Sequence, residues 1–112
     1  MSDCIFCKMV SGEIHPDMVY EDEWVIAFRD IHPKARVHVL VIPRQHIATL
    51  NDLPQDPSLA SALLGAVRKV AQLEGLSEGY RTVVNCGKDG GQEVFHLHFH
   101  VLGGRSFAWP PG

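Results

Sequence analysis

The stretch Phe95-His96-Leu97-His98-Phe99-His100-Val101-Leu102 carries three histidines at a strict spacing of two, with large apolar residues between them. Successive side chains of a β-strand point to opposite faces, so this pattern predicts a strand with all three histidines on one face. The apolar residues of the stretch then share the other face, which can lie on a core. Neighbouring imidazoles on such a strand are about 6.5–7 Å apart at Cβ, because each residue rises roughly 3.3 Å. The stretch therefore predicts both a core strand and a functional surface.

A row of three imidazoles has two functional interpretations. The first is a set of metal ligands, and the second is a nucleophile together with donors that surround a small anionic group. The alternative is a strand with an ordinary polar face in solvent, and such a strand does not require three imidazoles in a row. Because polar groups that converge on a rigid element are typical of a site, we expect the histidine row to carry the chemistry.

Length and composition limit the class of protein. The chain of 112 residues fits one domain over residues 1–112, long enough to bury a core. The net charge of −3 provides no basic field for nucleic acid. The longest apolar run, residues 37–42, is interrupted by His38 and is too short to span a bilayer, and the N-terminus has no secretory signal. Three cysteines argue against a disulfide framework, so we expect a cytoplasmic protein with neither nucleic acid nor membrane as partner.

Apolar periodicity and turn residues predict the other elements. The expected elements, in order, are a helix over residues 4–10, strands over residues 18–20, 24–30 and 37–42, a long helix from Asp56-Pro57 to Gly75 or Gly79, and strands over residues 80–86 and 95–102. They predict an α+β domain with a mainly antiparallel five-stranded sheet, one long helix on one face and a short N-terminal helix. Only a turn separates the last two strands, so we expect them to pair and to bring Asn85 near the histidine row.

Two further motifs have both a structural and a functional interpretation. The glycines of residues 87–91 form a hairpin turn or, beside the histidines, a cradle of backbone N–H groups for a phosphate. Asp30, at the end of a predicted strand, is a turn residue or an acceptor for a ribose diol. In the second case Phe28 and Ile31 would be walls for a flat base.

The pair Cys4 and Cys7 is spaced to supply half of a tetrahedral zinc site. His46 and one histidine of the row would complete a Cys2His2 set. The alternative is a pair of reduced thiols on a short helix. Cys86 stands alone and is expected to be a small strand residue.

The segment His96-Leu97-His98-Phe99-His100-Val101-Leu102 resembles the signature of the histidine-triad (HIT) superfamily, His-φ-His-φ-His-φ-φ with φ apolar. Within that superfamily the chain is similar to the Hint branch over nearly its whole length. The similar segments are Ala27-Phe28-Arg29-Asp30-Ile31, Leu40-Val41-Ile42-Pro43-Arg44-Gln45-His46, Gly79-Tyr80-Arg81, Val84-Asn85, Gly90-Gly91-Gln92 and the ending from Val101-Leu102-Gly103-Gly104-Arg105 to Trp109-Pro110-Pro111-Gly112.

The resemblance implies a homodimeric purine nucleoside phosphoramidase that cleaves the P–N bond of adenosine 5′-phosphoramidates and needs no cofactor for the chemistry. His98 would attack phosphorus and form a nucleotidyl-histidine intermediate, which water then hydrolyses. His46 and His96 would orient the site and relay protons to the leaving amine. The other implied contacts are His100, Asn85 and backbone groups of Gly91, Gln92 and Glu93 at the phosphate, Asp30 at the ribose, Ile5, Phe6, Phe28 and Ile31 near the base, and Trp109 in a tail that reaches the active site of the partner subunit.

The resemblance also implies an option for zinc and contains two departures. A subset of HIT proteins binds structural zinc, which would weaken the relay role of the two histidines among its ligands. The corresponding residues here are Cys4, Cys7, His46 and His96. Glu93 stands where the eukaryotic Hint pattern has Ser, so a hydroxyl donor is missing. Arg29 replaces a histidine, which would change contacts to the ribose or the base.

Two other functions stay open at the level of sequence. One is a nucleotide-binding or scaffold protein with incidental hydrolysis, because a binding pocket and an active site share many residues. The other is a dinucleoside polyphosphate hydrolase of the neighbouring Fhit branch. The Hint-like tail argues against this second alternative.

Overall fold

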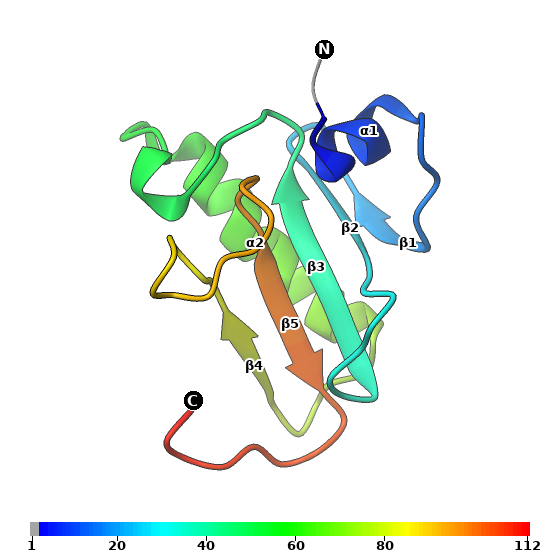
Figure 1. Cartoon of the computed structure of the whole chain (residues 1–112). Coiled ribbons are helices and arrows are strands. Elements are labelled where there is room, and N and C mark those ends of the chain that lie inside the picture. The colour runs from blue at the N-terminus through cyan, green and yellow to red at the C-terminus, as the bar shows by residue number, and fades with distance from the viewer. Residues whose placement is uncertain (1–2) are drawn as a thin grey trace.

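The computed structural model describes residues 3–112, which form a five-stranded sheet with the order β1-β2-β3-β5-β4 (Figure 1). Every neighbouring pair of strands is antiparallel. The elements are α1 (Ile5–Ser11), β1 (Met18–Glu21), β2 (Val25–Arg29), β3 (Val37–Pro43), the short 3-10 helix η1 (Leu50–Asp52), α2 (Pro57–Leu73), β4 (Tyr80–Val83) and β5 (Phe99–Gly103). The predicted fold class is confirmed.

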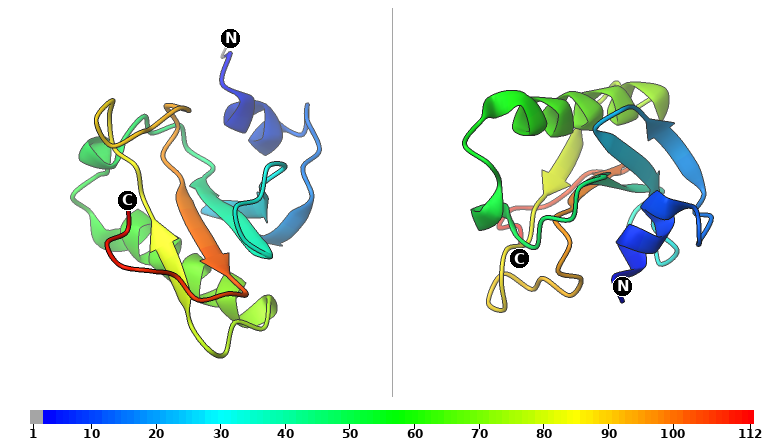
Figure 2. Two further views of the ribbon diagram at one scale, coloured as in Figure 1. Left: turned by 60° about the horizontal axis from the view of Figure 1, so that its bottom comes forward. Right: turned by 90° about the horizontal axis from the view of Figure 1, so that it is seen from above.

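Helix α2 covers one face of the sheet (Figure 2). It begins at the predicted position. Asp56 caps the helix by accepting a hydrogen bond from the N–H of Ser58 at 2.8 Å, and Pro57 follows at the first helical position. Its buried side chains are Leu59, Leu63, Ala66, Val67, Val70 and Ala71. Removal of one buried leucine from such a stripe costs about 2–5 kcal/mol. Among the described residues, no helix is long and apolar enough to cross a membrane.

Strand β3 lies in the middle of the sheet and is buried along its whole length, as predicted. Val39 and Val41 pack in the cluster under α2, whereas Leu40 and Ile42 pack in a second cluster on the opposite face. Since side chains alternate along a strand, His38 shares the face of Leu40 and Ile42. A polar residue is therefore built into an otherwise apolar strand, on the face away from α2.

Helix α1 lies on that second face, as the view from above shows (Figure 2). Cys4 is its N-cap and Gly12, at φ 86°, ends it in the left-handed conformation that glycine adopts most readily. Phe6 is the buried residue of α1, and its ring packs edge-on against Phe28 of β2 at 5.5 Å. The short helix thus begins and ends where the sequence predicts.

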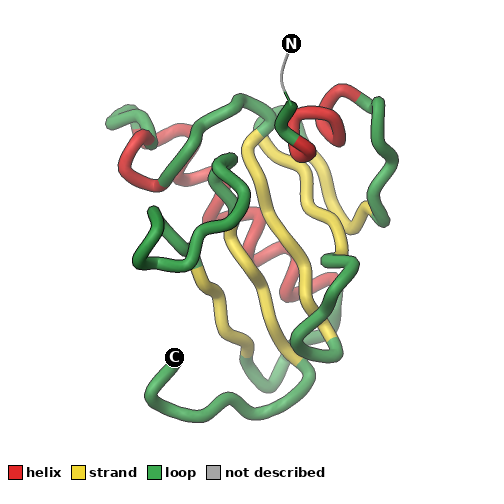
Figure 3. Tube along the Cα trace, in the orientation of Figure 1, coloured by secondary structure: helices red, strands yellow, loops and turns green. Residues whose placement is uncertain are grey.

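The last two strands are shorter than predicted. They pair as expected, with Val83 opposite His100, but β4 ends at Val83 and β5 begins only at Phe99. Residues 84–98 form a long connection, drawn as a loop in Figure 3. The reason is a hydrogen bond outside the sheet, in which the N–H of Leu97 donates to the carbonyl of Ile47 at 2.6 Å. Cys86 therefore lies in the connection and not in a strand, and Phe95, expected in the core, is 48% exposed.

Candidate active site

A cavity of about 420 Å³ opens on the face of the sheet away from α2. Its lining combines apolar side chains with histidines, carboxylates and an amide. The apolar lining includes Ile5, Phe6, Met9, Phe28, Leu40 and Val94, and the remaining lining includes Asp30, Ile31, Asn85, Gly91, Glu93, His98 and His100. Nearly all of the residues expected around a nucleotide therefore line one cavity. Gln92 and Trp109 are the exceptions, and they are described below.

His98 is buried and held in one orientation. Its Nδ1 lies 2.8 Å from the carbonyl oxygen of His96. A carbonyl can only accept, so Nδ1 carries the proton and the neutral ring keeps a lone pair on Nε2. The ring of Phe6 packs edge-on against His98 at 5.3 Å. The side chain is thus a fixed imidazole with a nucleophilic nitrogen.

His100 takes part in a chain of hydrogen bonds that begins at the backbone of Lys34. The N–H of Lys34 donates to Nδ1 of His38 at 3.0 Å, so neutral His38 must carry its proton on Nε2. Nε2 of His38 lies 2.9 Å from Nδ1 of His100 and donates to it. The proton of neutral His100 is therefore on Nε2. This chain sets His100 as a hydrogen-bond donor through its outer nitrogen.

Burial keeps this pair of histidines neutral. It lowers the pKa of His38, although Asp30 Oδ2, at 3.5 Å from His38 Nε2, opposes the shift. Burial, with the neighbouring His98 and His38, lowers the pKa of His100 from 6.5 to about 4. Both imidazoles are therefore uncharged at neutral pH. The sequence alone does not identify His38 as a site residue. The one feature of the sequence that could have indicated it is a histidine inside an otherwise apolar strand.

The four residues expected to bind zinc come together beside the start of α1. Nδ1 of His96 lies 3.4 Å from Cys4 Sγ and 3.6 Å from Cys7 Sγ, and Nδ1 of His46 lies 3.2 Å from Cys7 Sγ. A tetrahedral zinc ion with ordinary bond lengths separates sulfur and nitrogen ligands by about 3.5 Å. The Nε2 of His96 donates to the carbonyl of Pro43 at 2.9 Å, which leaves Nδ1 unprotonated and directed at the sulfurs. The donor set fits structural zinc.

The proton-relay role expected of His46 and His96 stays a prediction, and the contacts of both side chains are with the cysteine cluster and Pro43. Both nitrogens of His96 are committed, one to Pro43 and one to the cysteines, and His46 faces Cys7. The imidazole that contacts His100, a residue of the cavity lining, is His38. His46 thus belongs to the cysteine–histidine cluster, whereas the histidine hydrogen-bonded to His100 is His38 of β3.

Among residues 3–112, a second group of potential metal ligands consists of Asp30, His38 and His100. The hydrogen bond from Lys34 argues against a metal ion there. Because Nδ1 of His38 accepts that N–H, a metal on Nε2 would require an imidazole without any proton. The group is better described as a hydrogen-bonded pair of histidines beside a carboxylate.

The glycine loop is arranged differently from the predicted phosphate cradle. Gly91 adopts φ 83°, but its N–H donates to Lys88 and the N–H of Gln92 donates to Gly87, each at 3.1 Å. Both N–H groups are used within the turn, and the contact of this loop with a phosphate stays a prediction. The buried side chain of Gln92 accepts from the N–H of Gly87 and donates to the carbonyls of Ala48 and Val94. It fixes the loop beside the cavity.

Arg29 is part of the cavity lining, and Trp109 is not. Arg29 Nη2 donates to both carboxylate oxygens of Glu74, at 3.0 and 2.8 Å, and so joins the end of β2 to the end of α2. Trp109 is 81% exposed. Its predicted position in the site of a partner subunit stays a prediction.

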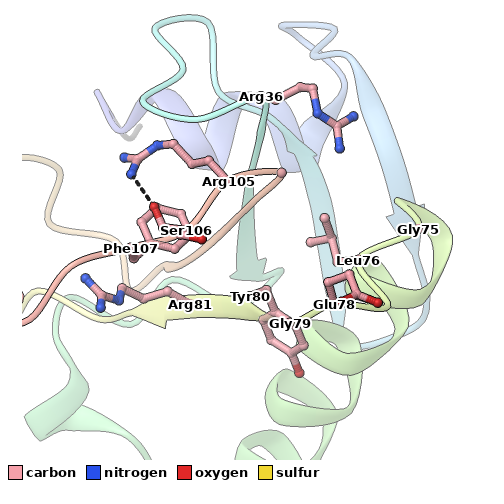
Figure 4. Close-up of a pocket in the computed structure, with 11 residues that line it drawn as sticks. Arg36, Gly75, Leu76, Glu78, Gly79, Tyr80, Arg81, Arg105, Ser106 and Phe107 are labelled. Atoms are coloured by element: carbon pink, nitrogen blue, oxygen red, sulfur yellow. Dashed lines mark hydrogen bonds between the residues drawn. The ribbon is translucent and has the colours of Figure 1, made fainter.

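A larger cavity, about 760 Å³, lies at another edge of the sheet (Figure 4). Its arginines hold the C-terminal tail. Arg81 donates to the carbonyl of Ala108 at 2.9 Å, Arg105 donates to the carbonyls of Ser106 and Lys34, and both guanidinium groups stack on Phe107. Its lining includes no histidine or cysteine. The smaller cavity, with His98 and His100, is therefore the candidate active site.

Comparison with known proteins agrees with this geometry. The sequence model of the family described as HIT domain matches residues 11–107 of this chain. The chain therefore belongs to the HIT family. It is similar to a HIT-like protein of Synechococcus elongatus, 55% identical over 111 residues, which are 98% of this chain and 97% of that protein. It is also similar to a HIT family hydrolase from Legionella pneumophila, with 51% identity, a TM-score of 0.94 and coverage of 98% of this chain and 100% of that one. A histidine triad nucleotide-binding protein from Candida albicans matches with 36% identity, a TM-score of 0.84 and coverage of 96% and 83%. The chain has the fold of the HIT family hydrolases.

Proposed function

We propose that the chain is a purine nucleoside phosphoramidase of the Hint branch, which cleaves the P–N bond of adenosine 5′-phosphoramidates. The observation that carries the proposal is the hydrogen bond from Nδ1 of His98 to the carbonyl of His96, which leaves the lone pair of the neutral ring on Nε2. The cavity supports a nucleotide as ligand, since its lining combines apolar side chains with histidines, carboxylates and an amide. The name of the Candida albicans protein, which describes it as nucleotide-binding, supports the same class of ligand.

In the proposed reaction, Nε2 of His98 attacks phosphorus, and the P–N bond breaks as the leaving nitrogen takes up a proton from water and departs as the amine. The product is a nucleotidyl-histidine whose positive imidazolium ring keeps its Nδ1 proton on the carbonyl of His96. Water then attacks phosphorus, and the bond from phosphorus to His98 breaks to release a nucleoside 5′-monophosphate. Covalent catalysis of this kind divides one difficult displacement into two easier steps.

His100 supplies a hydrogen bond to the phosphoryl group in this proposal. Because Nε2 of His38 donates to Nδ1 of His100, neutral His100 keeps its own proton on the outer Nε2, from which it can donate to a phosphoryl oxygen. A donor that is oriented before the reaction stabilises charge that develops in the transition state without further reorganisation. Asn85, which lines the same cavity, offers an amide for a second oxygen.

The ribose and the base would extend from the histidines towards α1. Asp30 lines the cavity, and its Oδ1 accepts the N–H of His32 at 2.8 Å, which fixes the carboxylate for a diol. Ile5, Phe6 and Phe28 form the apolar part, where a flat base can pack. Glu93 lines the cavity in place of the serine of the eukaryotic pattern, so its carboxylate would face the substrate where a hydroxyl does in that pattern.

We also propose that zinc binds Cys4, Cys7, His46 and His96 as a structural ion. Its support is the approach of the four ligand atoms, which all lie within 4.8 Å of one another. Such an ion would link the start of α1, through Cys4 and Cys7, to His46 after β3 and to His96 before β5. It takes no part in the reaction.

A homodimer is the proposed assembly. Strand β4 stands at one edge of the sheet, and an edge strand is a template for pairing with another chain. The exposed indole of Trp109 is available to a second subunit. Light scattering on the chromatographed protein should give twice the mass of one chain, and a Trp109→Ala variant that stays dimeric should lose turnover if the tail completes the site.

The experiment that tests the proposed function compares turnover with binding. Wild type and His98→Ala are supplied with adenosine 5′-phosphoramidate, and the affinity of each for AMP is measured by calorimetry. The proposal predicts that turnover is abolished while AMP binding is retained within about tenfold. Equal turnover by the two proteins would remove His98 from the mechanism. No turnover by wild type, with AMP bound, would favour a nucleotide-binding protein instead.

A further inference from the structure

Cys4 and Cys7 meet at the first turn of α1, where they can react with each other as well as bind a metal ion. Cys4 Sγ accepts a hydrogen bond from the N–H of Cys7 at 3.4 Å, and both sulfurs are only partly buried. His46, which contacts Cys7, is exposed, so this cluster opens to solvent. We propose that Cys4 and Cys7 are a redox modification site, at which a small disulfide such as oxidised glutathione closes a Cys4–Cys7 bond and lowers turnover. The effect on turnover rests on the proposed function.

The reaction is a thiol–disulfide exchange with the electrons in balance. One cysteine thiolate attacks a sulfur of oxidised glutathione, and the disulfide bond of glutathione breaks to release one reduced glutathione. The second cysteine then attacks the mixed disulfide and releases the other. The two cysteines lose two electrons and two protons, and the disulfide is reduced to two thiols.

Closing the bond must draw the two sulfurs together at the first turn of α1. Cys4 is the N-cap and Cys7 lies in the first turn, and the ligand atoms of their cluster lie within 4.8 Å of one another. A disulfide holds its two sulfurs about 2.05 Å apart. Phe6 lies within this turn and is buried, so its ring has to follow the backbone.

Two contacts carry that change to the nucleophile. The first is the ring of Phe6, which packs against His98 at 5.3 Å and against His96 at 5.8 Å. The second is His96 itself, whose Nδ1 faces both sulfurs and whose carbonyl oxygen orients His98. A shift of about 1 Å in a reacting group can cost roughly 100-fold in rate. The thiols therefore act on the reaction through position and not as reacting groups.

The same two sulfurs are half of the proposed zinc ligands, so metal and disulfide exclude each other. A disulfide leaves only His46 and His96 for the metal, too few for a structural zinc site. Oxidation should release zinc, and added zinc should slow the formation of the disulfide. This competition gives a readout that does not depend on turnover.

The test uses the full chain, purified without chelator and reduced. It is incubated with oxidised glutathione, with and without added zinc ions. Peptide mapping should find a Cys4–Cys7 disulfide, a chromogenic chelator should detect released zinc, and turnover should fall about 10–100-fold and recover with dithiothreitol. The matched control is Cys86→Ser, which removes the third cysteine and should respond as wild type does. Cys7→Ser should lose the response.

Three results would overturn the proposal. The first is a protein that forms no Cys4–Cys7 disulfide under these conditions. The second is a disulfide that leaves turnover unchanged, and the third is disulfide formation at the same rate with and without zinc. Since mapping is done on wild type, an unstable Cys7→Ser variant does not affect the outcome. If the reduced protein turns over no phosphoramidate, the proposed function fails, while mapping and zinc release still test the modification site.

Discussion

Nε2 of His38 lies 2.9 Å from Nδ1 of His100, and the backbone N–H of Lys34 holds His38 in the tautomer that donates to His100. A backbone group outside the cavity thus determines which nitrogen of His100 faces the substrate. The two histidines are on neighbouring strands, where the register sets Leu40 opposite His100 and places His38 diagonally across from it. The orientation of the donor is therefore a consequence of strand pairing.

Replacing His38 should impair catalysis more than binding. In His38→Phe the ring remains, but His100 loses its donor and can turn or change tautomer. We expect kcat for an adenosine phosphoramidate to fall about 10–100-fold, with KM nearly unchanged. The control is His32→Ala, an exposed histidine of the preceding loop, which should keep wild-type kcat. A His38→Phe protein with wild-type kcat would show that the hydrogen bond has no role in the reaction.

The stability of the fold should decrease in weak acid because His100 is buried in its neutral form. Its pKa is about 4 in the folded chain against an ordinary value of 6.5, so between these values the unfolded chain binds a proton that the folded chain does not. The free energy of unfolding must then fall as pH decreases from 6.5 to about 4, and this contribution levels off below that range. His38, with its lowered pKa, acts in the same direction.

Urea denaturation of wild type and His100→Asn at several pH values measures this contribution. The variant lacks the titrating ring, so its stability should depend less steeply on pH between 6.5 and about 4. The comparison cancels any protonation of the cysteine–histidine cluster, because both proteins contain it. Equal pH dependence in the two proteins would contradict the assignment of His100 as the neutral histidine.

Zinc should be present at about one ion per chain in protein purified without chelator, as expected for a four-ligand site. At a free zinc concentration 100-fold above its dissociation constant, the ion should raise the free energy of unfolding by about 2.7 kcal/mol. Elemental analysis and thermal melting, before and after treatment with a chelator, measure both quantities. Cys4→Ala should lose the metal, and Cys86→Ala should keep it. A metal-free protein whose melting is unchanged by added zinc would count against the ion.

Gln92 should matter for the stability of the loop that borders the site. Its side chain accepts from the N–H of Gly87 at 2.9 Å and donates to the carbonyl of Ala48 at 2.8 Å. Gln92→Leu keeps the approximate size but leaves these buried groups unsatisfied, so we expect a loss of about 1–3 kcal/mol in the free energy of unfolding. Glu93→Gln, at the exposed neighbouring position, should change it by less than about 0.5 kcal/mol. If both variants unfold alike, the bridging role of Gln92 is wrong.

The sequence predicts the elements whose signals are local. Asp56-Pro57 marks the start of α2, Gly12 marks the end of α1, and the apolar run of β3 predicts a strand buried on both faces. The spacing of Cys4 and Cys7 likewise depends on one turn of helix. In each case the deciding contacts lie within a few residues along the chain.

The sequence could not predict features that are decided by distant partners. The start of β5 at Phe99 depends on the hydrogen bond from Leu97 to Ile47, which comes from a different part of the chain. The role of His38 depends on the register of β3 with β5. Periodicity indicates which side chains share a face, but not which of them meet.

The covalent step at His98 is tested most directly by rapid quenching of the reaction with an adenosine 5′-phosphoramidate, followed by mass spectrometry of the digested protein. The account predicts a peptide that contains residue 98 with one added adenylyl group, formed and lost at rates that support turnover. His98→Ala should show neither the adduct nor turnover. Steady turnover by wild type without an adduct on His98, or an adduct on another histidine, would contradict the account.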